Sequence, residues 1–386
     1  MSKKHYNAII VGAGAGGGVV AKELSAAGLT VALMERGDWP IYDKHIVDEL
    51  ISQRTFVLGS VSGPDWHKNP RVFVHPDGRR ETLLPNDHRY SPLAACVGSG
   101  TVTYGAMAWR YMREDFRLVS TYGNVEGSTL EDWPVSYEEL EPYYEKAEWE
   151  IGVSGKKGAN PFEAPRKKDY PMPPFEAGKE GTVLSEAAKR LGFHPFPIPM
   201  LRNSVPYNNR PGCIRNRTCV GFQCPVDAKN GSQNTVIPVA LRTGNCDLYT
   251  NAKVAEILSK PNGNVEGIRF FNADDKEEII TSDIIVVSGS ATESARLMLN
   301  SKSDLFPNGL GNNNDWVGRN LQGHAYTSAY GLFEYDIKEY AGPGATIGLC
   351  DFNHHNEGIV GGGLLCNEFN NLAVKTSGRS TMGKGT

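Results

Sequence analysis

The chain carries near its N-terminus the stretch NAIIVGAGAGGGVVAKELSAAGLTVALMER, from Asn7 to Arg36. Its first apolar run, Ala8 to Val11, is short and rich in β-branched residues, which is typical of a fully buried parallel strand. Glycines follow at once in the pattern G-x-G-x-x-G, and a helix rich in small residues is predicted over Val19 to Ala27. A second buried strand is predicted over Thr30 to Met34. The stretch therefore predicts a strand, a glycine turn, a helix and a second strand.

The glycine turn has the composition of a dinucleotide-binding site. Its first glycine permits the tight bend, its second lets the backbone approach a pyrophosphate, and its third lets the helix pack against the strand. The unpaired amides and the positive dipole end of the helix would then face the phosphates. The predicted contact residues of this turn are Gly12, Gly14, Ala15, Gly16 and Gly17.

An acidic residue ends the second predicted strand. Glu35 stands where a carboxylate accepts hydrogen bonds from ribose hydroxyls in such sites. A carboxylate there repels a 2′-phosphate, which favours FAD or NAD over NADP. Arg36 follows directly and weakens that preference. The alternative interpretation is a glycine-rich turn in another kind of α/β protein, which would not need the acid.

Length and composition exclude several classes of protein. With 386 residues the chain can form one large or two ordinary domains. A net charge of -4 without a cluster of Lys or Arg argues against a nucleic-acid partner. No apolar run reaches the roughly eighteen residues of a membrane-spanning helix, so a cytoplasmic protein is expected.

A second glycine-rich segment, SPLAACVGSGTVTYGAMAWRY, spans Ser91 to Tyr111. Backbone with few side chains allows the close approach of a flat or phosphorylated ligand. A buried turn between two core elements explains the same spacing equally well. The residues alone leave both interpretations open.

This segment resembles the glycine-rich signature of the glucose-methanol-choline (GMC) family of FAD-dependent oxidoreductases. The resemblance implies that the segment lies along the pyrophosphate and the isoalloxazine ring of FAD. Some relatives have a histidine covalently bound to the flavin where this chain has Thr103, so noncovalent FAD is implied. The residues implied to contact FAD here are Gly98, Ser99, Gly100, Thr101, Thr103, Gly105 and Ala106.

A later segment carries further resemblance to the same family. Asp283 to Gly289 is predicted as a buried strand, and a helix is predicted over Thr292 to Asn300. The sequence SGSATESARLMLNS at this point resembles the second signature of the family. The resemblance implies that Ser288 and Gly289 contact the cofactor and that the backbone of Val254 meets the adenine ring.

The segment EDWPVSYEELEPYYEKAEWEIGVSG, residues 131–155, predicts an amphipathic helix. Ser136 is its predicted N-cap, Glu139 completes a capping box, and the helix is expected to run through Ile151. The segment is similar to one in gluconate-type and glucose-type dehydrogenases and in pyranose oxidases. The resemblance therefore points to the sugar-oxidising branch of the family.

The expected fold is a mixed α/β fold with a Rossmann-like FAD-binding domain and a discontinuous substrate-side domain. We expect the FAD-binding domain over residues 1-155 and 225-323, and the substrate-side domain over 156-224 and 324-386. The resemblance covers about two-thirds of a typical family member, so an incomplete substrate domain, as in a fragment, is expected. A three-stranded meander is predicted over 248–282, and strands of an antiparallel substrate sheet over 327–333, 345–351 and 358–368.

The chain has seven cysteines, an odd number that does not fit the disulfide framework of a small secreted domain. Cys213, Cys219 and Cys224 lie close together in the sequence, and some dehydrogenase relatives carry an iron-sulfur cluster in this region. Ligation of a cluster, a disulfide and redox-idle thiols all remain open, and the absence of tight two-residue spacing favours idle thiols over a metal site.

The activity that the resemblance implies is oxidation of a CH-OH group of an alcohol, most notably a sugar or polyol, by hydride transfer to FAD. The hydroxyl proton needs a base, which in the family is a C-terminal histidine followed by His or Asn. Nothing after Phe369 resembles that segment. Of the histidines near the predicted substrate sheet, His324 matches a noncatalytic family position, and His354 and His355 look like part of a turn.

We therefore assign no catalytic residue from the sequence. Two alternatives to a competent enzyme are a shortened FAD-binding chain that acts with another polypeptide and a noncatalytic flavin-binding fragment. A third alternative is an NAD-dependent dehydrogenase, which would not explain the signatures near Gly98 and Gly289. The sequence does not choose between O2, a quinone and a heme partner as the electron acceptor.

Overall fold

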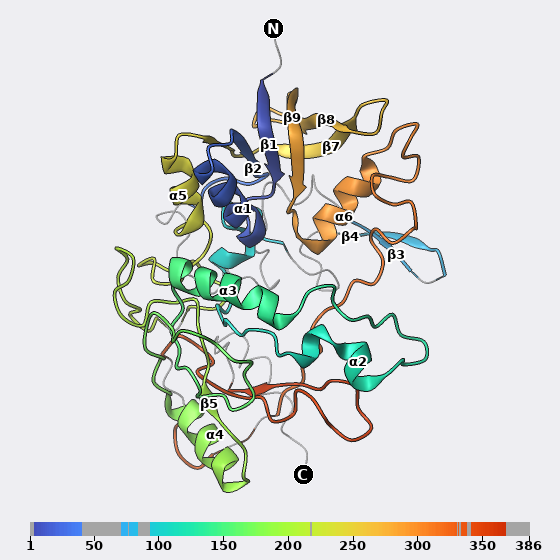
Figure 1. The fold of residues 1–386 in the computed structure, drawn as a ribbon. Coiled ribbons are helices and arrows are strands. Elements are labelled where there is room, and N and C mark those ends of the chain that lie inside the picture. The colour runs from blue at the N-terminus through green and yellow to red at the C-terminus, as the bar shows by residue number, and fades with distance from the viewer. Residues whose placement is uncertain are drawn as a thin grey trace. The chain divides into compact units, whose positions relative to one another are not determined.

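The computed structural model describes residues 4–40, 71–75, 77–83, 93–216, 218–329, 331, 333–337 and 341–367 (Figure 1). The chain forms two compact units. The first contains Met1–Tyr104, Gly221–Gln223 and Gly231–Tyr330, and the second contains Gly105–Val220, Cys224–Asn230 and Gly331–Thr386.

The first unit is built on a six-stranded sheet with the order β6-β2-β1-β9-β8-β7. β1 (His5–Val11), β2 (Val31–Met34) and β6 (Cys246–Tyr249) are parallel, and helix α1 (Ala15–Ala26) connects β1 to β2. The predicted order of strand, glycine turn, helix and parallel strand is confirmed. The helix begins at Ala15, earlier than the predicted Val19.

One long strand, β9 (Glu277–Val287), joins the two halves of this sheet. Its second half is parallel to β1, and its first half is antiparallel to β8 (Val265–Phe271), which pairs in turn with β7 (Lys253–Ser259). The sequence predicted a meander strand ending at Ser282 and a separate strand from Asp283. They form one continuous strand because Thr281 pairs with both neighbours, with Gly267 of β8 and with His5 of β1.

The start of the predicted meander also differs from the structure. The first predicted strand is two strands, β6 and β7, and β6 pairs with β2 rather than with the meander. Asn251 separates them in a left-handed conformation with φ of 51°, which ends regular strand geometry.

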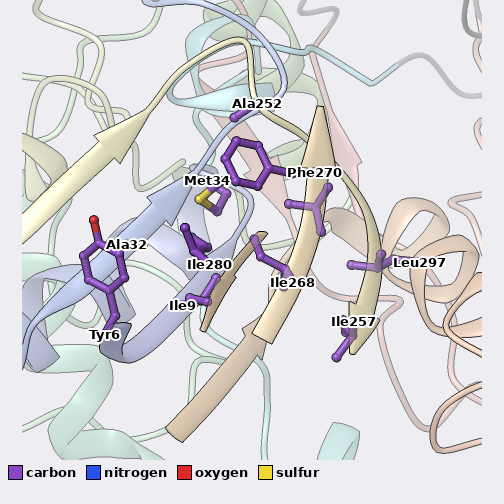
Figure 2. Close-up of a cluster of buried hydrophobic side chains, with 11 residues drawn as sticks. Tyr6, Ile9, Ala32, Met34, Ala252, Ile257, Ile268, Phe270, Ile280 and Leu297 are labelled. Atoms are coloured by element: carbon purple, nitrogen blue, oxygen red, sulfur yellow. The ribbon is translucent and has the colours of Figure 1, made fainter. Parts of the chain in front are cut away.

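Alternating side chains of β1 and β2 face opposite sides of the sheet. On one side of the sheet lie α1 and α5 (Val236–Arg242) (Figure 1), whose side chains belong to or pack against a buried cluster. On the other side, the β7–β8 hairpin and α6 (Ser290–Asn300) complete a second cluster (Figure 2). The first cluster includes Ile10, Val31, Leu33, Ile237 and Ala240, and the second includes Ile9, Ala32, Met34, Ile268, Phe270 and Leu297.

The second unit contains helices α2 (Leu118–Tyr122), α3 (Tyr137–Ala147) and α4 (Lys179–Arg190). A single π-helical turn, Glu148–Gly152, continues α3. The predicted capping box is confirmed, because the Ser136 hydroxyl accepts from the Glu139 amide and the Glu139 carboxylate accepts from the Ser136 amide. The predicted division into an FAD-binding and a substrate-side domain stays a prediction, and residues 105–155, which it assigns to the FAD-binding domain, lie in the second compact unit.

A small antiparallel sheet in the second unit has the order β11-β10-β5. Its strands are β5 (Phe196–Pro197), β10 (Ile347–Leu349) and β11 (Leu365–Cys366). The strands predicted over 345–351 and 358–368 are therefore present but much shorter. The strand predicted over 327–333 is wrong for the residues described there, which have no strand pairing.

Three short elements complete the description. The hairpin of β3 (Arg71–Val74) and β4 (Arg80–Leu83) belongs to the first unit, as does the 3-10 helix Ser99–Val102. A second 3-10 helix, Glu114–Phe116, precedes α2. Across the described parts of the chain, we find no helix with the length and apolar character needed to cross a membrane.

Candidate nucleotide-binding site

A pocket opens in the first unit where the carboxyl ends of β1, β2 and β9 meet the first turns of α1 and α6. The empty space at this site, including the part open to solvent, is about 660 Å³. β1 lies between β2 and β9, and such a position at the carboxyl edge of a parallel sheet is where α/β proteins bind nucleotides. The predicted residues that line it are Gly12, Gly14, Glu35, Arg36, Ser99, Val254, Ser288 and Gly289.

Two glycines of the turn, Gly12 and Gly17, have no room for a side chain, and at Gly14 a side chain would be a tight fit. A Cβ on Gly12, whose φ is 106°, would lie 2.4 Å from the carbonyl oxygen of Ser288. A Cβ on Gly17 would lie 1.9 Å from the carbonyl oxygen of Gly12, so only glycine lets α1 start this close to β1. A Cβ on Gly14 would lie 3.3 Å from the Cβ of Ser99. The turn is thus closely packed, and its open side faces the pocket.

Glu35 connects the end of β2 to the glycine turn. Its carboxylate accepts hydrogen bonds from the amides of Ala13, at 3.1 Å, and Gly37, at 3.0 Å. The residue is only 5% exposed, and burial raises the pKa of its carboxyl while the two amides oppose that rise. A carboxylate oxygen has two lone pairs, so these bonds leave Glu35 able to accept from a ribose hydroxyl.

The second glycine-rich segment lies directly against the first. The amide of Gly98 donates to the carbonyl of Ala13 at 2.9 Å. The Thr101 hydroxyl donates to the carbonyl of Gly98 at 2.6 Å and accepts from the amide of Ser232 at 3.1 Å. The Ser232 hydroxyl in turn donates to the carbonyl of Ala13 at 3.3 Å. The structure therefore brings the two glycine-rich stretches into one site.

Other predicted contact residues do not line the pocket. Seven of them lie in the first unit outside the lining. Gly105 and Ala106 belong to the second unit, where their carbonyls accept from the Arg202 guanidinium and the Leu201 amide. The seven in the first unit are Ala15, Gly16, Gly17, Gly98, Gly100, Thr101 and Thr103.

Two charged residues of α6 that were not predicted as contact residues also line the pocket. The Glu293 carboxylate lies between two guanidinium groups, 3.5 Å from Nη1 of Arg36 and 2.8 Å from Nε of Arg296. A signal was present, because Glu293 and Arg296 are three residues apart in a helix that follows a strand expected to return to the cofactor. The apolar residues missed in the lining are Val11, Met34, Leu93, Ala94, Ala252, Val287 and Leu297.

The cysteines of the second unit form no disulfide. Cys213, Cys219 and Cys224 are free thiols, as are the other four cysteines. The amide of Arg215 donates to the Cys213 sulfur at 3.3 Å, and burial raises the pKa of the Cys213 thiol. Within the described residues, no three or more His, Cys, Asp or Glu side chains are grouped as metal ligands would be. The disulfide alternative is therefore wrong for this structure.

The histidines near the predicted substrate sheet have different surroundings. His354 contacts the Tyr122 hydroxyl through Nδ1 at 2.8 Å and Asp115 through Nε2 at 3.0 Å, and its side chain is 6% exposed. Both ring nitrogens are thus engaged within the protein. His355 is exposed and lies 3.8 Å from Glu114, while His324 is exposed and belongs to the first unit.

Comparison with known proteins identifies the family of the chain. Residues 6–326 match the family model described as GMC oxidoreductase, and this range contains both glycine-rich stretches and α6. The chain belongs to the GMC oxidoreductase family. Members of this family are FAD flavoproteins that act on the CH-OH groups of alcohols and sugars.

Three curated relatives resemble the chain over most of its length. The fructose dehydrogenase large subunit of Gluconobacter japonicus is 31% identical over 82% of this chain and 58% of its own length. The gluconate 2-dehydrogenase flavoprotein of Pantoea cypripedii is 27% identical over 93% and 64%. The 2-methyl-1,2-propanediol dehydrogenase of Mycolicibacterium austroafricanum is 30% identical over 94% and 63%. The chain therefore spans about three-fifths of these relatives.

Proposed function

We propose that the chain binds FAD noncovalently, with the adenosine and pyrophosphate moieties of FAD in the pocket of the first unit. The observation that carries this proposal is the closely packed glycine turn at the carboxyl end of β1, where a side chain on Gly12 or Gly14 would meet neighbouring atoms within 3.3 Å. The amides at the start of α1 can bind phosphate oxygens. Ala252, Val254 and Leu297 supply apolar surface for an adenine ring.

Further residues fit roles in this FAD site. Glu35 can accept hydrogen bonds from ribose hydroxyls, while its amide contacts hold the carboxylate at the end of β2. Ser99 of the second glycine-rich segment and Ser288 of the β9 end lie in the same lining. Thr103 has no nucleophilic ring nitrogen with which to form the flavin bond that a histidine forms at this position in some relatives, which supports noncovalent binding.

We further propose that the protein oxidises a CH-OH group of a sugar or polyol. Family membership supports the reaction class, and the names of the fructose, gluconate and propanediol dehydrogenases support the substrate class. Bound FAD would accept the hydride from the carbinol carbon. The hydroxyl proton requires a base, and we assign that role to no described residue, since His354 uses both ring nitrogens within the protein.

The NAD-dependent alternative is less well supported. An NAD site would require the first glycine turn and the acid, but not the second glycine-rich segment, whose Gly98 amide donates to the turn at Ala13. The GMC family match over residues 6–326 includes both segments.

Anaerobic reduction tests the proposed activity. The purified chain, loaded with FAD, should lose its visible flavin absorbance on mixing with D-fructose, D-gluconate or a polyol, and free FAD under the same conditions should not. Bound flavin that stays oxidised with every alcohol would contradict the proposed activity of this chain, while leaving its FAD site intact. Formation of NADH from added NAD would support the alternative.

A further inference from the structure

Glu293 holds the arginine that follows the ribose-binding acid. The carboxylate of Glu293, in the first turn of α6, contacts Arg36 with one oxygen at 3.5 Å and Arg296 with the other at 2.8 Å. The side chains of Arg36 and Glu293 are 16% and 10% exposed. At such depth, charges interact more strongly than they do in water, so removal of either one changes the potential in the pocket.

Arg36 lies where an arginine can affect the binding of a 2′-phosphate. In nucleotide-binding α/β folds, an arginine near the end of the second strand accommodates the 2′-phosphate of NADP, whereas an acid there binds the free ribose hydroxyls. This chain has both residues, Glu35 and Arg36, at the end of β2. From the sequence alone, Glu35 argues against a 2′-phosphate in the pocket, and Arg36 weakens that argument.

We propose that Glu293 determines the specificity of the pocket for an adenosine without a 2′-phosphate. Glu293 engages the guanidinium of Arg36, and its negative charge adds to that of Glu35 in repelling a 2′-phosphate. Arg36 would otherwise offer a fork of donors to that phosphate. The inference rests on the proposed FAD site.

The test uses two ligands that differ in one group, ADP-ribose and ADP-ribose 2′-phosphate. Their dissociation constants are measured by calorimetry with the chain free of flavin. The wild-type chain should prefer ADP-ribose. In E293Q, which keeps the size and one acceptor of the side chain, that preference should fall by about tenfold, the equivalent of about 1.4 kcal/mol. This fall should come from tighter binding of ADP-ribose 2′-phosphate to E293Q. The double variant R36Q/E293Q should lose that tighter binding.

A matched control and an opposite variant complete the design. E256Q also removes a carboxylate paired with an arginine, Arg269 at 2.6 Å, but lies outside the pocket lining and should leave the preference unchanged. R36Q alone leaves Glu293 without the Arg36 charge and should strengthen the preference for ADP-ribose. It therefore tests the inference even if E293Q does not fold.

The outcomes separate this inference from the cofactor proposal. ADP-ribose that binds to the wild-type chain with a preference unchanged by both E293Q and R36Q would overturn the role of Glu293 alone. Equal weakening of both ligands in E293Q would show a structural role and would also overturn it. A folded wild-type chain that binds neither FAD nor ADP-ribose would overturn the cofactor site and this inference together.

Discussion

Gly17 shows how a single residue fixes the geometry of the site. A Cβ at this position would lie 1.9 Å from the Gly12 carbonyl oxygen, so a side chain would push α1 away from β1. The neighbouring Gly16 has only the Ser288 hydroxyl near its would-be Cβ, at 4.0 Å. Two adjacent helical glycines thus differ in what a methyl group would meet.

Substitution of these two glycines should give opposite results. Gly17→Ala should lower the free energy of unfolding by about 1–3 kcal/mol or more, because a methyl group overpacks the turn. Gly16→Ala should raise it by about 0.5–1 kcal/mol, because alanine is the better helix former. Urea unfolding of both variants without flavin, followed by circular dichroism, measures the difference. Equal effects would contradict the close approach of α1 to β1.

Glu35 should make stability depend on pH. Burial raises the pKa of Glu35 in the folded chain above its value in the unfolded chain. At pH values between these two pKa values, the native chain therefore keeps a proton that the unfolded chain has released. The contribution of Glu35 to stability is therefore full below the ordinary glutamate pKa, about 4.3, and is lost as the pH rises through the raised pKa.

The comparison with Glu35→Gln isolates this effect, since the other titrating groups are common to both proteins. The free energy of unfolding of the wild type minus that of E35Q should decline as the pH rises from about 4.3. Urea titrations at a series of pH values measure it. A difference that is constant or grows with pH would contradict the direction of the pKa shift.

The contact between Arg36 and Glu293 could not be predicted from the sequence. Gly12, Gly14 and Glu35 follow from a local pattern because their spacing fixes their positions around one turn. Arg36 and Glu293 are far apart in the sequence, and only the pairing of β1 with β9 brings them together. Local spacing carries no information on such a contact.

At the scale of elements, buried ion pairs hold the π-helical turn that continues α3 against other parts of the second unit. Arg110 and Arg166 both contact Glu148, at 2.8 and 2.9 Å, and all three side chains are at most 7% exposed. Breaking a buried ion pair by removing one partner leaves an uncompensated charge. Exposed pairs such as Arg113 with Glu138, whose side chains are more than half exposed, contribute much less.

Two substitutions, one in the buried ion pairs and one in an exposed pair, test this difference. Glu148→Gln should destabilise the second unit by up to about 3–5 kcal/mol, since it leaves Arg110 with the more distant carboxylate of Glu141, at 3.4 Å, and Arg166 with that of Glu163, at 3.5 Å. Glu138→Gln should cost at most about 1 kcal/mol. Urea unfolding followed by tryptophan fluorescence suits this region, because Trp149 adjoins Glu148. Equal costs for the two variants would show that the ion pairs around Glu148 do not stabilise the unit.

The position of a strand could be predicted from the sequence where the strand keeps the same partners along its length. It was harder to predict where a strand changes partners. Residues 7–36 form the predicted elements because short apolar runs and glycine spacing act locally. β9 was predicted as two strands because its pattern changes where its partner changes from β8 to β1. The strands β10 and β11 are shorter than the alternating stretches that predicted them. Alternation shows which residues can share a face of a sheet, but it does not show where the partner strand ends.

At the scale of the whole molecule, the family match and the pocket support the same cofactor. The match covers residues 6–326, and the pocket draws its lining from five separated parts of that range. The chain spans 58% to 64% of the three relatives named above, and its reaction and substrate are proposals. Binding of FAD is the property that the first unit can show by itself, because the entire pocket lies within it.

The direct test of the proposed FAD site is titration of the purified, flavin-free chain with FAD. Flavin fluorescence should change to a saturation point of one FAD per chain, and ADP-ribose should compete because it occupies the adenosine and pyrophosphate part of the pocket. Circular dichroism confirms that the chain is folded during the titration. A folded chain that shows no saturable change on addition of FAD would contradict the proposed site.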